Sequence, residues 1–246
     1  MSKIDRLSAL IENFRLKVVP VAPNAANLIA FQPHNSSEIQ LEFHPQSKGV
    51  ECARGVPLFT LFADFGSSAN PVLAALPNIF CRTVQPDDEI APLVQMLANE
   101  QMANRCGGAA VLGRLGEVLL VRILRELLDT NAANSGMLAG LADARLSRAI
   151  VQMHDNPGRD WRNADLAEIA GLSHSRFKEL FVQIVGENPG SYLRRWRLTL
   201  AKSEIERGRR VDMVARKYGY QAPDAFSRAF SRQFGIRPKS LAMQHV

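Results

Sequence analysis

A sequence pattern that occurs twice, 48 to 49 residues apart, is the feature that most constrains how this chain folds. Residues 166–171 (LAEIAG) match residues 214–219 (VARKYG) at an offset of 48, with the alanine and the final glycine in common. Beyond the glycine the offset is 49, and the matches are Phe177 with Phe226, Phe181 with Phe230, Gly186 with Gly235, and Pro189 with Pro238. The chain therefore carries one structural unit twice, with one extra residue in the second turn.

The shared residues predict the local structure of each copy. A glycine suits a turn that needs positive φ, and a small alanine lets two helices approach closely. Two phenylalanines four residues apart lie on one face of a helix and can pack together. The pattern is that of a helix-turn-helix, present at about 163–186 and about 211–235. We expect an all-α domain over residues 145–246.

Charge divides the chain at the same place. Residues 1–144 contain 11 Lys and Arg and 14 Asp and Glu, a net charge of −3, whereas residues 145–246 contain 19 and 10, a net charge of +9. A basic domain with a helix-turn-helix pattern indicates a polyanion such as nucleic acid as its partner. A basic solvated surface without a partner is the alternative.

The second helix of each copy is expected to face DNA. On a helical wheel the phenylalanines point inward and leave a polar face outside. The major groove admits a helix whose side chains reach base edges while Arg and Lys hold phosphates. The candidate DNA-binding residues are His174, Ser175, Arg176, Lys178 and Glu179 in the first copy and Pro223, Asp224, Ser227, Arg228 and Arg232 in the second. Ordinary solvated helix faces remain the alternative.

Residues 189–207 are predicted to form one helix that joins the two copies, because proline begins the segment and apolar residues recur at helical spacing. A helix of about 20 residues is roughly 30 Å long, close to the ~34 Å turn of DNA. The two second helices can then reach successive major grooves. Arg194, Arg195 and Arg197 on the joining helix are expected to be solvated, with some phosphate contact.

The first part of the chain has a different pattern. Short apolar runs at 28–31, 39–43 and 58–62, separated by turn residues, predict strands. Residues 89–104 and 109–129 are predicted helices. The broad apolar face of the second needs a partner, either its own domain or the same helix of another chain. Residues 131–144 are the candidate linker. The fold class is therefore α+β, with a β-rich domain over residues 1–130 followed by the all-α domain.

The second part of the chain resembles a known family. Residues of about 145 to 241 are similar to the DNA-binding domain of the AraC/XylS family of transcriptional regulators, and residues 219–238 (GYQAPDAFSRAFSRQFGIRP) match its signature almost throughout. The resemblance implies seven helices and a sequence-specific regulator, more often an activator than a repressor. Its partners would be double-stranded promoter DNA and RNA polymerase. Ala222 departs from the family, which commonly has a capping Ser or Asp there.

The first part resembles, less closely, the cupin-like sensor domain of one branch of that family. The similar segments are 5–11 (DRLSALI), 69–77 (ANPVLAALP) and 117–124 (EVLLVRIL), and the β portion is shortened. The resemblance implies a module that senses an effector, whose identity it does not give, or that forms a homodimer through residues 109–129. No His-x-His with a following Glu is present, which weakens the case for a bound effector.

Neither catalysis nor a cofactor has support in the sequence. GxSxG, Walker A and GxGxxG patterns are absent, and His34 and His44, the only histidines of the β region, are expected to be surface or packed residues rather than metal ligands. Charges throughout residues 1–20 disfavour a signal peptide, and prolines interrupt the uncharged stretch 65–81. We expect a cytoplasmic, nucleoid-associated protein without a metal, a cofactor or a membrane anchor.

Two other hypotheses stay open. Cys52 and Cys81 lie near Arg54 and Arg82 in the sequence, and a basic neighbour suits a redox-sensing thiol, as in some relatives of this branch. Inert buried thiols are the alternative. The chain could also be a protein-interaction module that keeps the helix-turn-helix scaffold without DNA binding and pairs through residues 109–129. DNA binding weakens steeply with salt, whereas apolar helix pairing does not.

Overall fold

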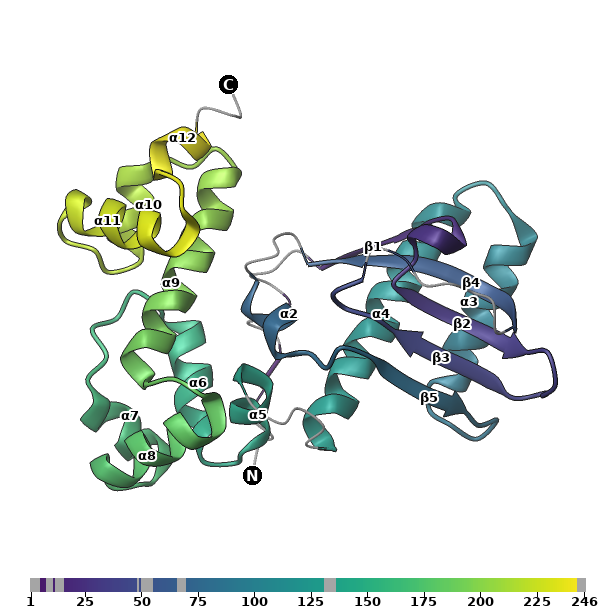
Figure 1. Ribbon diagram of the computed structural model, residues 1–246, viewed down its shortest axis with the longest axis horizontal. Coiled ribbons are helices and arrows are strands. Elements are labelled where there is room, and N and C mark those ends of the chain that lie inside the picture. The colour runs from purple at the N-terminus through teal and green to yellow at the C-terminus, as the bar shows by residue number, and fades with distance from the viewer. Residues whose placement is uncertain are drawn as a thin grey trace. The chain divides into compact units, whose positions relative to one another are not determined.

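The computed structural model describes residues 5–7, 11, 16–47, 49, 55–65, 70–130 and 136–242 (Figure 1). The chain folds into two compact units. The sheet unit consists of Arg15–Ser68 and Leu76–Ala132, and the helical unit of Met1–Phe14, Ala69–Ala75 and Ala133–Val246. The chain therefore passes between the units more than once.

The sheet unit is built on five antiparallel strands in the order β1-β4-β2-β3-β5. Their bounds are Lys17–Pro20 for β1, Leu28–Pro33 for β2, Ile39–Phe43 for β3, Gly55–Asp64 for β4 and Phe80–Val84 for β5, and a short 3-10 helix, η1 (Pro23–Ala25), follows β1. Leu28 lies opposite Phe43 on one side and Leu61 on the other, so apolar residues line up across the sheet. The predicted strands at 28–31, 39–43 and 58–62 are confirmed.

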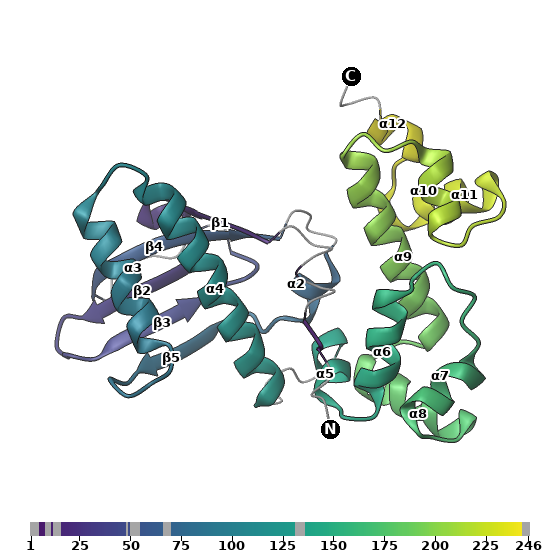
Figure 2. The ribbon, with the colours of Figure 1, turned by 180° about the vertical axis from the view of Figure 1, so that it is seen from behind.

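Two helices, α3 (Ala91–Ala103) and α4 (Gly108–Asp129), cover one face of the sheet, as Figure 2 shows. The apolar stripe of α4, which includes Leu112, Leu119 and Ile123, is buried. Its partner is thus the sheet of its own unit, the first of the two possibilities that the sequence left open. The α+β class, with a β-sheet domain before a helical domain, is confirmed.

Glycines allow α4 to approach the sheet closely. A Cβ at Gly113 would lie 2.8 Å from the carbonyl oxygen of Val18 in β1, and a Cβ at Gly116 would lie 2.6 Å from a methyl carbon of Val18. Neither distance is compatible with an ordinary van der Waals contact. The two glycines therefore set the separation between α4 and β1.

The helical unit contains α2 (Pro71–Ala75), α5 (Met137–Ala142), α6 (Leu146–Asp155), α7 (Asn163–Ala170), α8 (His174–Val185), α9 (Pro189–Glu206), α10 (Val211–Lys217), α11 (Pro223–Phe234) and α12 (Pro238–Ala242). Helices α6 to α12 are the seven that the family resemblance implies. Among the residues that the structure describes, none of the helices combines the length and the apolar character that crossing a membrane requires.

The segment expected to be a linker, residues 131–144, contains helix α5. Leu138 and Leu141 in α5 are fully buried, and a Cβ at Gly140 would lie 2.6 Å from Ile150 and 2.8 Å from Val185. These apolar contacts are the reason why residues 137–142 form a helix of the helical unit. Residues 131–135 lie outside the described residues, and the domain boundaries at 130 and 145 stay a prediction.

Replacing Gly113 with Ala tests the close approach of α4. An alanine usually stabilises a helix interior by about 0.5–1 kcal/mol relative to glycine. Here the new Cβ meets backbone, so we expect a loss of about 1–3 kcal/mol in the free energy of unfolding. Gly108→Ala in the same helix is the control, because its Cβ meets only the end of the Glu100 side chain. Denaturant unfolding measures both, and equal stability of the two variants would contradict the argument.

Candidate nucleic-acid interface

The repeat forms two helix-turn-helix units with the same internal geometry. The first is α7, Gly171 and α8, and the second is α10, Gly219 and α11. Gly171 has a φ of +70° and Gly219 a φ of +81°. A residue with a Cβ rarely adopts this conformation, which explains the glycine at the same place in both copies.

The inner faces of α8 and α11 are as predicted. Phe177 and Phe181 are fully buried with ring centroids 5.6 Å apart, and Phe226 and Phe230 are fully buried with centroids 5.5 Å apart. Each pair fixes the rotation of its helix, because turning the helix would expose both rings. The opposite face of each helix is thereby turned to solvent.

The outer faces carry the candidate residues. His174, Ser175, Arg176, Lys178, Glu179, Pro223, Asp224, Arg228 and Arg232 are exposed, and Ser227 is half-buried. The two faces differ in their charge pairing. On α8, Arg176 Nη1 donates to Glu179 Oε2 at 2.8 Å. On α11, Arg228 and Arg232 form no ion pair with any residue in the described part of the chain.

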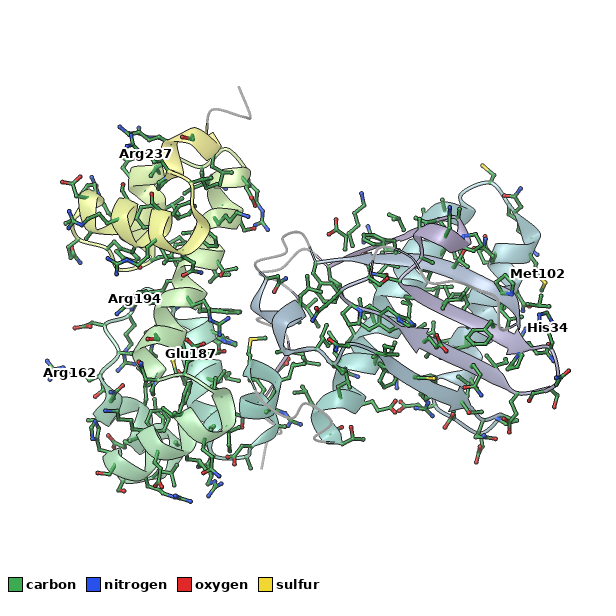
Figure 3. All side chains as sticks on the ribbon, viewed as in Figure 1. His34, Met102, Arg162, Glu187, Arg194 and Arg237 are labelled. Atoms are coloured by element: carbon green, nitrogen blue, oxygen red, sulfur yellow. The ribbon has the colours of Figure 1, made fainter. Side chains whose placement is uncertain are left out.

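Helix α9 separates the two helix-turn-helix units. Its 18 residues correspond to a length of about 27 Å. In both ribbon views α8 and α11 lie towards opposite ends of α9 and on the same side of it (Figures 1 and 2). Figure 3 shows Arg162 and Arg194 on that side as well. Sequence reasoning missed Arg162, which stands just before α7 rather than on a second helix.

The other two arginines of α9, Arg195 and Arg197, form hydrogen bonds within the protein. Arg195 Nε donates to Glu187 Oε1 at 2.9 Å, and Arg197 donates to the carbonyl oxygens of Pro157 and Arg159. Burial lowers the pKa of Arg197. The expectation of solvated side chains was therefore wrong for these two residues. Arg194 is exposed, as expected.

The helix starts differ between the two units. The Ser173 hydroxyl accepts from the backbone N–H of Arg176 at 3.3 Å and caps α8. Ala222 occupies the same position before α11 and offers no side-chain cap, while Pro223 begins the helix and Asp224 follows in its first turn. Pro and Asp are favourable there because proline needs no N–H partner and the carboxylate complements the helix dipole.

A buried histidine holds α6 against α9. His154 Nε2 lies 2.6 Å from the hydroxyl of Tyr192, and its ring stacks on Trp196 with centroids 3.7 Å apart. Burial, with the nearby charge of Arg195, lowers the pKa of His154 to about 3. The imidazole is therefore neutral at physiological pH and acts as a packing and hydrogen-bonding group.

This histidine predicts a pH dependence of stability. Because the folded state disfavours the proton, the contribution of His154 is complete above the ordinary pKa of 6.5 and is lost as the pH falls towards 3. The slope is at most about 1.4 kcal/mol per pH unit. Denaturant unfolding between about pH 7 and about pH 5, above most carboxyl titration, should show this slope in the wild type and lack it in His154→Gln. Exposed His174→Gln should keep it, and parallel slopes in all three proteins would contradict the assignment.

The cysteines give a mixed result. Cys52 lies outside the described residues. Cys81 is exposed on β5, with Sγ 3.9 Å from Glu42 Oε1 on the neighbouring strand. Arg82 donates to Glu126 and Asp88 at 2.6 Å each. Successive residues of a strand point to opposite faces, so the inference of a basic neighbour from Arg82 was wrong, and the thiol faces a carboxylate instead.

The histidines of the sheet unit lie apart. His34 is exposed in the turn after β2 (Figure 3), whereas His44 Nε2 lies 3.0 Å from Glu42 Oε2. Within the described residues, no group of three or more His, Cys, Asp and Glu side chains is arranged to hold a metal ion.

Comparisons with known proteins agree with this architecture. Residues 166–244 match a family model described as a helix-turn-helix domain, and residues 17–129 match one described as a cupin. Residues 166–244 include α8 and α11. A protein of Streptomyces lividans named as an AraC-like transcription regulator is 39% identical over 126 residues. The chain thus matches a cupin model followed by a helix-turn-helix model, and it is similar to proteins named as AraC-like regulators. Its candidate interface is the part of the helix-turn-helix domain that carries the repeat.

The relatives are longer than the matched region. An HTH-type transcriptional regulator of Haemophilus influenzae is 30% identical over 190 residues, which are 76% of this chain and 64% of that protein. The Streptomyces match covers 50% of this chain and 41% of its relative. Thus the chain spans less than two thirds of these relatives. A solved structure of ToxT from Vibrio cholerae aligns over 94% of this chain and 91% of its own, with a TM-score of 0.43 and 12% identity.

Proposed function

We propose that this protein is a sequence-specific DNA-binding transcriptional regulator of the AraC type, an activator rather than a repressor, and not an enzyme. The observation that carries the proposal is the placement of α8 and α11 on one side of α9 (Figure 1) with their polar faces in solvent. An α9 length of about 27 Å suits two helices that enter successive major grooves, about 34 Å apart.

The side chains suggest roles within each groove. Arg228 and Arg232, which lack protein ion pairs in the described chain, are available for guanine or phosphate contacts. Arg176 exchanges its Glu179 partner for DNA, which leaves the carboxylate able to accept from cytosine N4. Lys178 and Arg194 are assigned to phosphates. His174, Ser175, Pro223, Asp224 and Ser227 lie at or near the helix starts, where side chains approach base edges.

Replacing Arg228 with Ala tests this assignment. Duplexes are first selected from a random-sequence pool by the wild-type protein, and binding is then measured over a range of salt concentrations. We expect a loss of about 1–3 kcal/mol if Arg228 contacts a base, or a salt slope smaller by about one if it contacts a phosphate.

Arg105→Ala is the matched control for that experiment. It removes an exposed arginine between α3 and α4, outside the helical unit, and should leave both affinity and slope unchanged. Genome-wide occupancy of tagged wild-type protein then locates the promoters, and transcription in vitro with RNA polymerase separates activation from repression. A folded protein that selects no DNA and shows no salt-dependent binding would favour the protein-interaction module.

The sheet unit is proposed to sense an effector and to form a homodimer through residues 109–129. The apolar stripe of α4 is already buried, so the dimer contact must use its outer face. Val111 and Val118 lie seven residues apart on α4 and are 42% and 49% exposed. Two valines at this spacing form a stripe on which the same helix of a second chain can pack. The protein is expected to work in the cytoplasm on the nucleoid.

Val118→Glu tests this dimer. Sedimentation should show the wild type as a dimer and the variant as a monomer, since a carboxylate cannot be buried in an apolar helix contact without a partner. Val56→Glu, at a valine of β4 that is 58% exposed, controls for the same added negative charge away from α4. A wild-type monomer at concentrations well above those in a cell would overturn the proposed contact.

A further inference from the structure

The two helix-turn-helix units are joined at a second point besides α9. The loop between α6 and α7 runs beside the middle of α9 in both ribbon views (Figures 1 and 2). Within this loop, Gly158 approaches the turn between α10 and α11. A Cβ at Gly158 would lie 2.2 Å from the carbonyl oxygen of Lys217, and a Cβ at Gly219 would lie 2.9 Å from the carbonyl oxygen of Gly158. Loop and turn are therefore in backbone contact.

Arg197 of α9 holds this contact in place. Its Nε donates to the carbonyl oxygen of Pro157 at 2.5 Å, and its Nη2 donates to that of Arg159 at 2.6 Å. The two acceptors flank Gly158, so one guanidinium is hydrogen-bonded to the loop on both sides of the contact point. A planar fork of donors suits two carbonyls in a way that a lysine ammonium does not.

The same guanidinium also lies against the second unit. A Cβ at Gly219 would be 3.5 Å from Cζ and Nη2 of Arg197, so the glycine leaves just enough room for the side chain. Burial raises the pKa of Tyr220, while the charge of Arg197 opposes this change. The Tyr220 ring packs edge-on against Phe226 in α11 at 5.2 Å. Arg197 therefore lies against Gly219, and the next residue, Tyr220, packs on the core of the second helix-turn-helix unit.

Two side-chain contacts hold the loop between α6 and α7 together. Trp161 Nε1 donates to the carbonyl oxygen of Asn156 at 2.9 Å, and the Arg159 guanidinium lies 4.1 Å from the centroid of the Trp161 ring. These two contacts close the ends of the loop on each other. Loops whose ends are held together by their own side chains are compact.

We propose that Arg197 is a positioning residue that fixes the angle between the two units and thereby the spacing of the two DNA half-sites. Helix α9 fixes the distance between the two helix-turn-helix units, but by itself it leaves them free to rotate relative to each other about its axis. A second, off-axis attachment removes this freedom. The inference builds on the proposed DNA binding, because a set angle matters when both helices must enter one duplex together.

The first arm of the test needs no DNA. Hydrogen exchange is measured on the full chain for wild type, Arg197→Met and Arg194→Met, the last being an exposed arginine of the same helix. In Arg197→Met we expect exchange to rise about tenfold in residues 156–161 and 217–220 together, with α8 unchanged. Arg194→Met should match wild type. Unchanged exchange in both segments would overturn the inference whatever the protein binds.

The second arm uses duplexes selected by the wild-type protein, with one or two base pairs inserted between the half-sites. Wild type should lose about 100-fold in affinity, because both helices can no longer bind at once, while Arg197→Met should lose less than about tenfold. Arg194→Met can bind more weakly throughout but should keep the wild-type spacing preference. Arg197→Lys should lie between the two.

These outcomes separate the two proposals. If wild type selects no duplex, the proposed function fails, and the exchange data still decide whether Arg197 joins the units. If wild type binds and Arg197→Met keeps the full spacing preference, the inference fails and the proposed function stands. Should Arg197→Met not fold, Gly158→Ala replaces it, since its Cβ pushes the loop away from Lys217 while Arg197 remains.

Discussion

The packing of Tyr192 and Trp196 at the start of α9 is the interaction on which the helical unit depends. Each side chain is 1% exposed. Tyr192 reaches His154 in α6 through its hydroxyl and meets the edge of Phe181 in α8, while Trp196 stacks on His154. Burial of two large aromatic residues contributes several kcal/mol. Helix α8 thus takes its position from the buried aromatic residues of α9.

Charged contacts help to attach the second helix-turn-helix unit to the same helix. Glu204 near the end of α9 accepts from Lys217 and from the hydroxyl of Tyr218. Burial alone would raise the pKa of Glu204, but these two hydrogen bonds lower it on balance. Lys202 lies 5.5 Å from the Phe234 ring centroid. These charged contacts near the end of α9 add to the apolar packing there, since Ala201 and Ile205 are fully buried.

How far the sequence predicts the molecule depends on the range of the interaction. The spacing of Phe177 and Phe181 predicts a helix and its buried face, because both follow from helical geometry alone. The partners of Arg197 and Arg82 could not be predicted, because they lie on elements whose approach is set by tertiary packing. The same holds for α5: its small and apolar residues suggest a loop until Ile150 and Val185 are placed beside Gly140. Whether each exposed side chain contacts DNA is a property of the complex.

The helical unit is discontinuous in the sequence. It includes residues 1–14 and 69–75 as well as the residues from 133 onward, and α5 packs into its core. A fragment that begins at residue 145 would lack α2 and α5 and would expose Ile150 and Val185 to water. Any exchange of the sheet unit between relatives, in the laboratory or in evolution, must therefore preserve these outlying segments. A recombination point at residue 145 would therefore separate segments that fold together.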